Sequence, residues 1–299
     1  MVATVKEVAK WLIVGGDGQL GRAMQAELLK SDTEFLALNH SQLDITDENA
    51  VTNSILQHHP NVVLNAAGWT NVDGAEDSEE IARLINAISP GYLAEACSQI
   101  KSKFLHISTD YVFSGNAKIP WTEGSPLSPI SAYGRTKAEG EGVVRNVYPT
   151  GSYIVRTSWL YSPWGKNFVK TMIHLALEEI GPVKVVSDQY GQPTSALDLA
   201  SRLNHMVGRG IAPGVYHGTN SGKASWFEFA QYIFKKCGAD PERVLSVDSN
   251  HEPRSAKRPF YSVLGHQRWI DVGLEPMQDW HDAIDEMFPL LINAGNLGE

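Results

Sequence analysis

A glycine-rich turn near the start of the chain, GGDGQLG (15–21), limits the possible folds more than any other feature of the sequence. It follows the apolar run WLIV (11–14) and precedes a segment of helical periodicity (19–30). Glycines at this spacing let the backbone reach positive φ, approach a pyrophosphate closely and pack the helix on the strand, while the helix N-terminus favours negative charge. The turn therefore predicts a dinucleotide-binding βαβ unit in which Gly15, Gly18 and Gly21 line the cofactor.

Apolar runs and helix-compatible segments alternate through the first half of the chain. We expect further strands at 35–39, 61–68 and 103–109, and helices at 19–30, 47–57 and 81–97. The first helix is expected to place Leu20, Met24, Leu28 and Leu29 on one apolar face. This alternation predicts an α/β protein with a Rossmann-type, doubly wound parallel sheet that is covered on both faces. Ligand-binding groups should then lie at the carboxyl ends of the strands, around 15–21, Asn39, 66–70 and 108–111.

The pattern becomes less regular after Tyr153. Residues 152–161 predict one more strand, and 182–200 a strand and loop that lead into a helix. Segments rich in Gly, Pro, Ser and Asp at 181–194, 210–224 and 248–262 predict a smaller substrate-binding lobe. The expected organisation is an N-terminal extension (1–10), a dinucleotide-binding domain with the catalytic side chains (11–155), and a mainly substrate-binding lobe (156–299) with segments that return to the main domain.

Charge and cysteine content narrow the range of partners. The formal net charge is -9 and Lys and Arg are scattered, which argues against a nucleic-acid partner. Cys97 and Cys237 lie far apart, and no compact set of metal ligands stands out, so we expect neither a disulfide nor a metal site. No leader-like stretch and no window close to the roughly 18 apolar residues of a membrane span occurs, so a cytoplasmic protein without a membrane partner is predicted.

Tyr133 and Lys137 form a YxxxK pair that would lie on one helix face, one turn apart. Hydride transfer to a carbonyl leaves an alkoxide that needs a proton, and an adjacent ammonium would bring the pKa of a tyrosine toward the working range. Any helix with this spacing matches the pair, but the glycine turn in the same chain favours the catalytic interpretation. Thr109 ends a predicted strand, where its hydroxyl would either bind the reacting oxygen or close the strand end.

Residues near the end of the second strand bear on the choice of cofactor. Asn39 stands where an acid that binds the ribose of NAD is usual, about 20 residues after the turn. His40 and Ser41 could accommodate a 2′-phosphate, whereas Asp17 would repel one. The balance favours NADPH over NADH, and both remain candidates. Asp44 is placed either for a contact with the adenine edge or for a helix cap or turn.

The motifs together resemble a known family. They are GGDGQLG, NAAGWTNVDGAE, HISTDYVFSG, SAYGRTKAEGE, VRTSWLYSPWGKNF, SDQYGQPTSALDLA and KRPFYSVL. In order and spacing, from about residue 11 to about residue 285, they resemble the dTDP-4-dehydrorhamnose reductase family of the extended short-chain dehydrogenase/reductase superfamily. The resemblance implies that NAD(P)H reduces the C4 ketone of dTDP-4-dehydro-6-deoxy-L-mannose (dTDP-6-deoxy-L-lyxo-4-hexulose), a dTDP-sugar substrate, to give dTDP-L-rhamnose.

The resemblance also implies roles for individual residues. Tyr133 would be the proton donor, Lys137 the ribose ligand that perturbs the phenol, and Thr109 the hydroxyl that polarises the C4 carbonyl. Cofactor contacts are implied for Gly18, Gln19, Leu20, Asp44, Ile45, Ala66, Ala67, Gly68, Thr70, Tyr133 and Lys137. Substrate contacts are implied for Thr70, Val72, Thr109, Asp110, Tyr111, Tyr133 and Trp159, with Asn167, Gln192 and Arg258 as further candidates for the diphosphate. Trp159 is one of eight tryptophans and could equally be a core or rim residue.

Several alternatives stay open at this level. Related sugar 4,6-dehydratases carry Asp-Glu after the catalytic Thr, whereas this chain has Asp110-Tyr111, so reduction is favoured over dehydration. A non-catalytic NADP-binding regulatory subunit, similar to the β subunit of methionine adenosyltransferase, would share the fold. A ketoreductase for another dTDP-4-keto-deoxy sugar would share the chemistry, and epimerisation and a homodimeric assembly are also left open.

Overall fold

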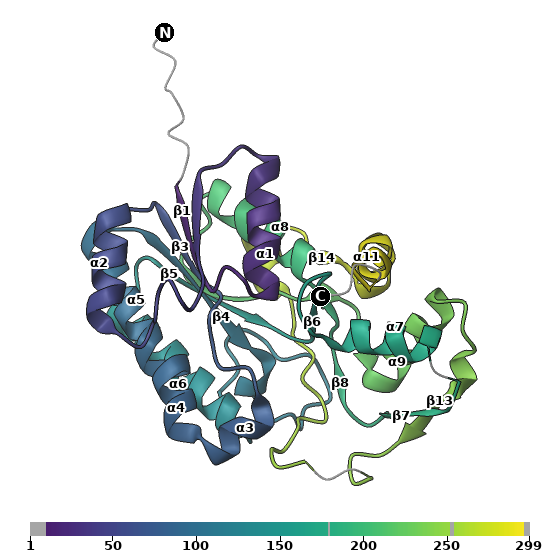
Figure 1. The fold of residues 1–299 in the computed structure, drawn as a ribbon. Coiled ribbons are helices and arrows are strands. Elements are labelled where there is room, and N and C mark those ends of the chain that lie inside the picture. Colours follow the sequence, from purple (N-terminus) through teal and green to yellow (C-terminus); the bar gives the residue numbers. More distant parts are fainter. Residues whose placement is uncertain (1–9, 179, 252–253, 296–299) are drawn as a thin grey trace.

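A six-stranded parallel sheet forms the centre of the computed structural model, which describes residues 10–178, 180–251 and 254–295 (Figure 1). Its order is β10-β5-β4-β3-β1-β2. The strands are β1 (Trp11–Val14), β2 (Phe35–Leu38), β3 (Val62–Asn65), β4 (Lys103–Thr109), β5 (Ser152–Thr157) and β10 (Gly214–His217). The predicted Rossmann-type α/β fold is confirmed. The expected extension at 1–10 lies outside the described residues except for Lys10.

The strand order creates a crevice at one edge of the sheet. From β1 the chain runs first to β2 on one side and later to β3 on the other, and both pair with β1 in parallel register. In open α/β sheets, ligands bind outside the carboxyl ends of the strands at such a switch point. Here the glycine turn follows β1 at that point.

Helices cover both faces of the sheet. α1 (Gln19–Lys30) and α8 (Ala196–Gly208) pack together on one face, and α2 (Glu48–His58), α5 (Ser89–Ile100) and α6 (Ala132–Val147) on the other (Figure 1). In α1, Leu20, Met24 and Leu28 are buried as predicted, but Leu29 is 70% exposed. The prediction for Leu29 was wrong because nine residues after Leu20 is half a turn out of phase in a helix of 3.6 residues per turn. No helix among the described residues is long and apolar enough to cross a membrane.

The segment predicted as one helix at 81–97 is divided into several parts. α3 (Val72–Asp77) and α4 (Glu79–Arg83) lead into a π-helical turn, η1 (Leu84–Ile88), before α5 begins. The π turn contains the buried Asn86, whose amide donates to the Trp69 carbonyl at 3.1 Å and accepts from the Trp69 amide at 2.9 Å. Wide turns of this kind are frequent at functional sites. This one ties the helix to the loop that follows β3.

A second, smaller part of the molecule has a core of its own. Its main elements are α7 (Phe168–Glu178), α9 (Trp226–Lys236), α11 (Trp280–Gly295) and the paired strands β7 (Val183–Val186) and β13 (Val244–Val247). The remaining short elements are β6 (Leu160–Tyr161), β8 (Tyr190–Gly191), β9 (Thr194–Ser195), β11 (Asn220–Ser221), β12 (Ala224–Ser225), β14 (Met277–Asp279), α10 (Gln267–Asp271) and the 3₁₀ turns η2 (Asp110–Val112) and η3 (Pro241–Arg243). One intervening stretch supplies β10, which pairs with β5, so the chain leaves the main sheet and returns to it.

Two glycines of α6 provide a test of the packing. A Cβ on Gly140 would overlap the carbonyl oxygen of Asn86, whereas a Cβ on Gly142 meets nothing within 4 Å. We expect Gly140→Ala to lower the free energy of unfolding by about 1–3 kcal/mol through overpacking. Gly142→Ala should raise it by about 0.5–1 kcal/mol, because alanine has the higher helix propensity. Urea unfolding of both variants checks this, and equal effects would contradict the close approach of α6 to Asn86.

Candidate functional site

The glycine turn forms a backbone cradle at the switch point. Gly15 has a φ of +85°, and a Cβ there would lie 2.7 Å from the amide nitrogen of Ala67. A Cβ on Gly21 would overlap the Gly15 carbonyl oxygen. Gly18 is the N-cap of α1 and provides no side-chain cap, so the first amides of the helix are available to a ligand. This bare, tightly packed turn fits the pyrophosphate of a dinucleotide.

Side chains at the end of β2 close the cradle on one side. Asn39 donates to the carboxylate of Asp17 at 2.8 Å and accepts from the amide of Ser41 at 3.1 Å. The amide of Asn39 therefore links the glycine turn to β2 and stands where the ribose contact is predicted. Asp44 accepts from the hydroxyl and amide of Thr46, and these hydrogen bonds lower its pKa. It is a turn carboxylate in this structure, and its adenine contact stays a prediction.

The loop after β3 forms the facing wall. The amide of Ala67 donates to Asn65 Oδ1 at 3.1 Å, and Asn86 holds the backbone of Trp69 from the π turn. Gly68 is exposed, and a Cβ on it would lie 4.0 Å from Lys137 Nζ. The other predicted cofactor and substrate residues of this region have these positions: Ile45 is buried before α2, Ala66 is half-buried, Thr70 is exposed, and Val72 begins α3. Asn86 was not predicted, and its only signal was a polar side chain within an otherwise apolar helical pattern.

Thr109 and Tyr133 come together from β4 and α6. Thr109 ends β4, and Tyr133 lies in the first turn of α6, two residues after the N-cap Ser131. Burial raises the pKa of Tyr133 to about 12, and a hydrogen bond with the Thr109 hydroxyl partly opposes this shift. The ring of Tyr111 stands edge-on to Tyr133 with 5.7 Å between centroids. The phenol is therefore protonated near neutral pH, as a proton donor must be.

Lys137 lies one turn further along α6. Its Nζ donates to the carbonyl of Ile107 at 2.5 Å and lies near Gly68. Burial lowers the pKa of Lys137 to about 8, and the carboxylate of Glu141 works in the opposite direction. Sequence reasoning expected Lys137 to bring the pKa of Tyr133 toward neutrality. In the structure that pKa is raised instead, because burial of the phenol outweighs the groups that lower it.

Asp110 is a buried carboxyl beside the catalytic hydroxyl. It is 2% exposed, and its Oδ1 accepts from the Thr109 hydroxyl at 3.0 Å. Burial raises the pKa of Asp110 to about 6, and its Oδ2 has no hydrogen-bond partner among the described residues. Tyr111 follows at the position where a dehydratase would carry a second carboxylate. Hydrogen bonding to Ser262 and Thr109 partly opposes the shift in the pKa of Asp110, and the contact of this residue with a bound sugar stays a prediction.

An ion pair that the sequence did not reveal lies one helical turn beyond Lys137 on α6. Glu141 binds Arg156 through two contacts, Nε to Oε1 at 2.8 Å and Nη2 to Oε2 at 2.7 Å. The Ser108 hydroxyl also donates to Oε1 at 2.5 Å. Both charged side chains are at most 2% exposed. Neither Glu141, in a predicted helix, nor Arg156, in a predicted strand, has a local sequence pattern that would predict their contact.

Trp159 lies at the start of the smaller part of the molecule. It has a φ of +45°, and its ring stacks on Trp226 with 3.6 Å between centroids. The ring also covers Gly191, where a Cβ would lie 2.5 Å from it. The structure places Trp159 in a partly buried aromatic pair, and its contact with a sugar stays a prediction.

The three candidates for diphosphate contacts differ in their surroundings. Gln192 is buried, with its amide bound to the backbone of Leu264. Asn167 donates to the side-chain oxygen of Gln19 at 3.0 Å. Arg258 donates to the carboxylate of Asp73, at the start of α3, at 2.7 Å. Arg258 is thus the candidate whose cationic head bridges the two parts of the molecule.

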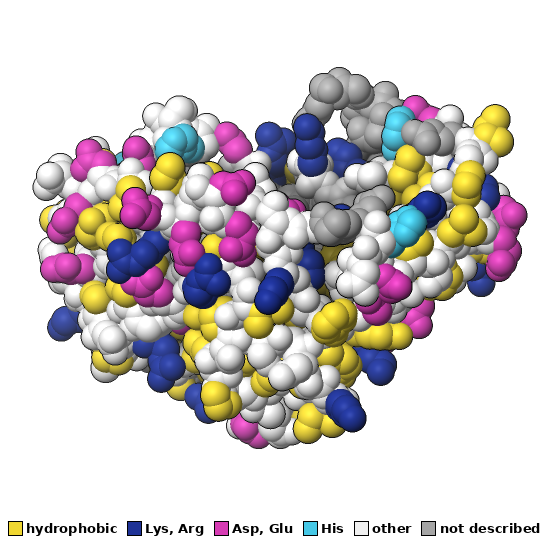
Figure 2. Space-filling view, turned by 90° about the horizontal axis from the view of Figure 1, so that it is seen from below, with side chains coloured by type: hydrophobic (Ala, Val, Ile, Leu, Met, Phe, Trp, Pro, Cys, Tyr) yellow, Lys and Arg dark blue, Asp and Glu magenta, His cyan; other side chains and the backbone are white. Residues whose placement is uncertain are grey.

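Positively charged side chains lie on the face where the main sheet and the smaller part of the molecule meet. Figure 2 shows a hollow between them with Lys and Arg side chains at its rim. Arg254 and Arg258 both influence the pKa of Tyr111, which places two guanidinium groups close to the catalytic end of the sheet. Among the described residues, no group of three or more His, Cys, Asp or Glu side chains is arranged to hold a metal ion.

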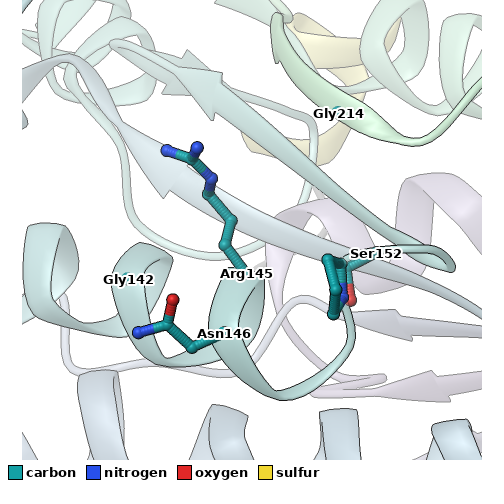
Figure 3. Close-up of a pocket in the computed structure, with 6 residues that line it drawn as sticks. Gly142, Arg145, Asn146, Ser152 and Gly214 are labelled. Carbon is teal, nitrogen blue, oxygen red and sulfur yellow. The ribbon is translucent and has the colours of Figure 1, made fainter.

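A separate cavity of about 440 Å³ lies at the other end of the strands (Figure 3). Its lining is Gly142, Arg145, Asn146, Pro149, Ser152 and Gly214. Ser152 begins β5 and Gly214 begins β10, whereas Thr109 ends β4. The cavity is therefore remote from the catalytic residues, which lie at the carboxyl ends.

Comparison with known proteins agrees with this geometry. Residues 9–292 match the RmlD substrate binding domain family. A dTDP-4-dehydrorhamnose reductase of Streptomyces griseus is 44% identical over 94% of this chain and 94% of its own length. A probable dTDP-4,6-dihydroxy-2-methyloxan-3-one 4-ketoreductase of Streptomyces antibioticus is also 44% identical, over 95% of this chain and 96% of its own.

Solved structures give the same relationship. A dTDP-4-dehydrorhamnose reductase of Clostridium acetobutylicum superposes with a TM-score of 0.91 at 42% identity, over 95% of this chain and 99% of that one. The enzyme of the same name from Bacillus anthracis, solved in complex with NADP, has a TM-score of 0.91 at 35% identity, with the same coverage of 95% and 99%. The similarity thus spans both parts of the molecule.

Proposed function

This chain belongs to the RmlD family of dTDP-4-dehydrorhamnose reductases in the extended short-chain dehydrogenase/reductase superfamily, and we propose that it reduces the C4 ketone of dTDP-4-dehydro-6-deoxy-L-mannose to give dTDP-L-rhamnose. The observation that carries this proposal is the convergence of Thr109, Tyr133 and Lys137 beside a glycine cradle. A nicotinamide cofactor fits that cradle, and the dTDP-4-dehydrorhamnose reductase of Bacillus anthracis was solved in complex with NADP. The regulatory-subunit alternative is not favoured, because relatives that are 41–44% identical to this chain are named reductases.

The chain's own residues supply the proton and the orientation. When bound, the cofactor supplies the hydride. Tyr133, which is protonated near neutral pH, donates its phenolic proton to the developing alkoxide, and an alkoxide is the stronger base, so the transfer favours the alcohol. Thr109 polarises the ketone by turning its single hydroxyl proton to the carbonyl oxygen, away from Asp110 Oδ1, which accepts it in the free protein. Lys137 holds the nicotinamide ribose and stabilises the phenolate left behind. With no carboxylate at position 111, no base is placed for elimination.

We further propose that Arg258 and Arg254 receive the diphosphate of the substrate. Both lie close enough to Tyr111 and Asp73 to influence the pKa of each. A guanidinium is suited to bidentate recognition of phosphate oxygens. Residues 11–155 would then hold the cofactor, and 156–299 would mainly hold the sugar nucleotide. A cytoplasmic location and a homodimer are predictions that belong to the same proposal.

The proposal is tested by following NADPH oxidation with dTDP-6-deoxy-L-lyxo-4-hexulose and identifying the product by mass and NMR. Formation of dTDP-L-rhamnose supports it. Because a relative of this chain is named dTDP-4-keto-6-deoxy-D-glucose reductase, that sugar serves as the second substrate. Preferential turnover of the second sugar would assign the chain to another ketoreductase specificity, and tight NADPH binding without turnover of either would revive the regulatory alternative.

We propose NADPH as the preferred cofactor, with NADH also accepted, because His40 and Ser41 follow β2 where they could accommodate a 2′-phosphate; Asp17 opposes this preference. Asp17 places a carboxylate in the glycine turn next to the predicted ribose contact Asn39. Asp17→Asn should raise kcat/KM with NADPH about three- to tenfold, since the carboxylate repels a 2′-phosphate by about 1 kcal/mol in a solvated site. The value with NADH should change less than about twofold. Asp32→Asn, at the far end of α1, is the control, and an unchanged NADPH-to-NADH ratio in Asp17→Asn would contradict the proposed position of the 2′-phosphate.

A further inference from the structure

Three functional groups of α6 lie on one face at intervals of four residues. Tyr133, Lys137 and Glu141 succeed one another toward the middle of the helix, and all three turn toward the sheet. Residues four apart are neighbours on a helix surface. The side chain below the catalytic lysine is therefore a carboxylate, although the proposed mechanism assigns it no role.

The position of Glu141 is fixed from two strands. Ser108, the residue before the catalytic Thr109, donates to it from β4, and Arg156 grips both of its oxygens from β5. Arg156 is itself held over the ring of Phe113 at 5.0 Å. A bidentate guanidinium pair of this kind is directional and rigid. Glu141 thus connects the catalytic helix to the strand that carries the catalytic hydroxyl.

From this arrangement we propose that Glu141 is a positioning residue, which stabilises the ammonium form of Lys137 from one helical turn below and fixes α6 against the end of β4. The inference rests on the proposed function, because it concerns the lysine of that mechanism. The buried pair of Glu141 and Arg156 would then serve catalysis as well as the stability of the fold. A buried carboxylate is an effective source of potential because little water screens it.

The other titratable groups around Lys137 do not replace this charge. His106 on β4 is fully buried and its pKa is held well below the ordinary value, so it is neutral. His217 on β10, which contacts Arg156, has a pKa lowered to about 3 by burial and is also neutral. Glu141 is the carboxylate that raises the pKa of Lys137 against the effect of burial.

Two further carboxyl groups act elsewhere. Asp110, at the end of β4, raises the pKa of the phenol of Tyr133. Glu123, in the loop that faces β5, contacts Arg156 through its backbone carbonyl at 3.2 Å. Neither contributes to the pKa of Lys137, which responds to burial and to Glu141. Removal of the Glu141 charge should therefore let Lys137 lose its proton at lower pH.

The test is the pH dependence of Glu141→Gln. Burial lowers the pKa of Lys137 to about 8 in the wild type, so we expect the alkaline limb of the kcat/KM profile to move down by about one pH unit in the variant. The activity of the variant should be about tenfold lower than wild type at alkaline pH. At about pH 6 it should be within about twofold of wild type. Glu139→Gln is the control, because it removes a carboxylate from the same helix, where Glu139 pairs with Arg83 of α4, and it should leave the limb in place. A uniform loss at all pH values would show a purely structural role and overturn the proposal.

A second variant covers the case in which Glu141→Gln does not fold with Arg156 left unpaired. Glu141→Gln/Arg156→Leu removes both charges, and the proposal predicts the same displaced limb. NADPH affinity, measured against pH by fluorescence titration, provides a readout that needs no sugar. If the pH profile of NADPH affinity is displaced but the dTDP-sugar is not turned over, the result contradicts the proposed function and keeps this inference. If the pH profile of the folded double variant is the same as that of wild type, the inference alone is overturned.

Discussion

Replacing Tyr133 with Phe should lower kcat for ketone reduction by about 10²- to 10⁴-fold, the usual contribution of a positioned acid. The change removes one oxygen atom from a side chain whose phenol is protonated near neutral pH and bonded to Thr109. The hydride would still reach the carbonyl carbon, but the alkoxide would have no nearby proton. Stopped-flow measurement of NADPH absorbance under saturating substrate gives kcat directly.

The control for this prediction is Tyr148→Phe, which removes the same atom at the other end of α6. It should leave kcat within about twofold of wild type. NADPH affinity should be similar in both variants, since the phenol acts in the chemical step. A Tyr133→Phe enzyme that keeps more than about a tenth of wild-type kcat would show that another group delivers the proton.

Replacing Gly15 with Ala should damage both folding and cofactor binding. The residue has a φ of +85°, and a Cβ would press on the backbone of Ala66 and Ala67. We expect the free energy of unfolding to fall by about 1–3 kcal/mol, the usual cost of a non-glycine residue in this strained region. The turn and the β3 loop would also move apart, so the dissociation constant for NADPH should rise at least about tenfold.

Urea unfolding and fluorescence titration with NADPH measure these two effects separately. Gly124→Ala is the matched control, because a Cβ there meets nothing within 4 Å and the loop lies away from the glycine turn. Wild-type stability together with wild-type NADPH affinity in Gly15→Ala would mean that the turn does not need the conformation described.

The fold of the first half of the chain could be predicted because its sequence patterns are short-range. The glycine turn, the apolar strands and the YxxxK pair are readable because each depends on residues within a few positions of one another. The position of Thr109 at the carboxyl ends of the strands follows from the rules for parallel sheets, whereas the order of the strands came from the structure. The prediction for Leu29 failed because this residue lies on the opposite side of α1 from Leu20, where it is exposed to solvent.

The features that the sequence did not reveal depend on contacts between distant segments. Arg156 and Glu141 each look ordinary in their own element, and they become a buried pair only when β5 and α6 are packed together. Asn86 is positioned by a π turn, for which single-sequence patterns carry no signal. The raised pKa of Tyr133 has the same origin, because burial depends on everything packed around the ring.

Gln19, the first residue of α1, is bonded to the smaller part of the molecule as well as following the glycine turn. Its amide donates to the carbonyl of Leu160 at 3.4 Å and accepts from Ser162 at 3.1 Å and from Asn167 at 3.0 Å. A displacement of the turn would therefore be transmitted to residues 160–167, in the part of the chain proposed to hold the sugar nucleotide. Thermodynamic linkage makes such coupling reciprocal: whatever factor the dinucleotide adds to the affinity for the sugar nucleotide, the sugar nucleotide returns to the dinucleotide.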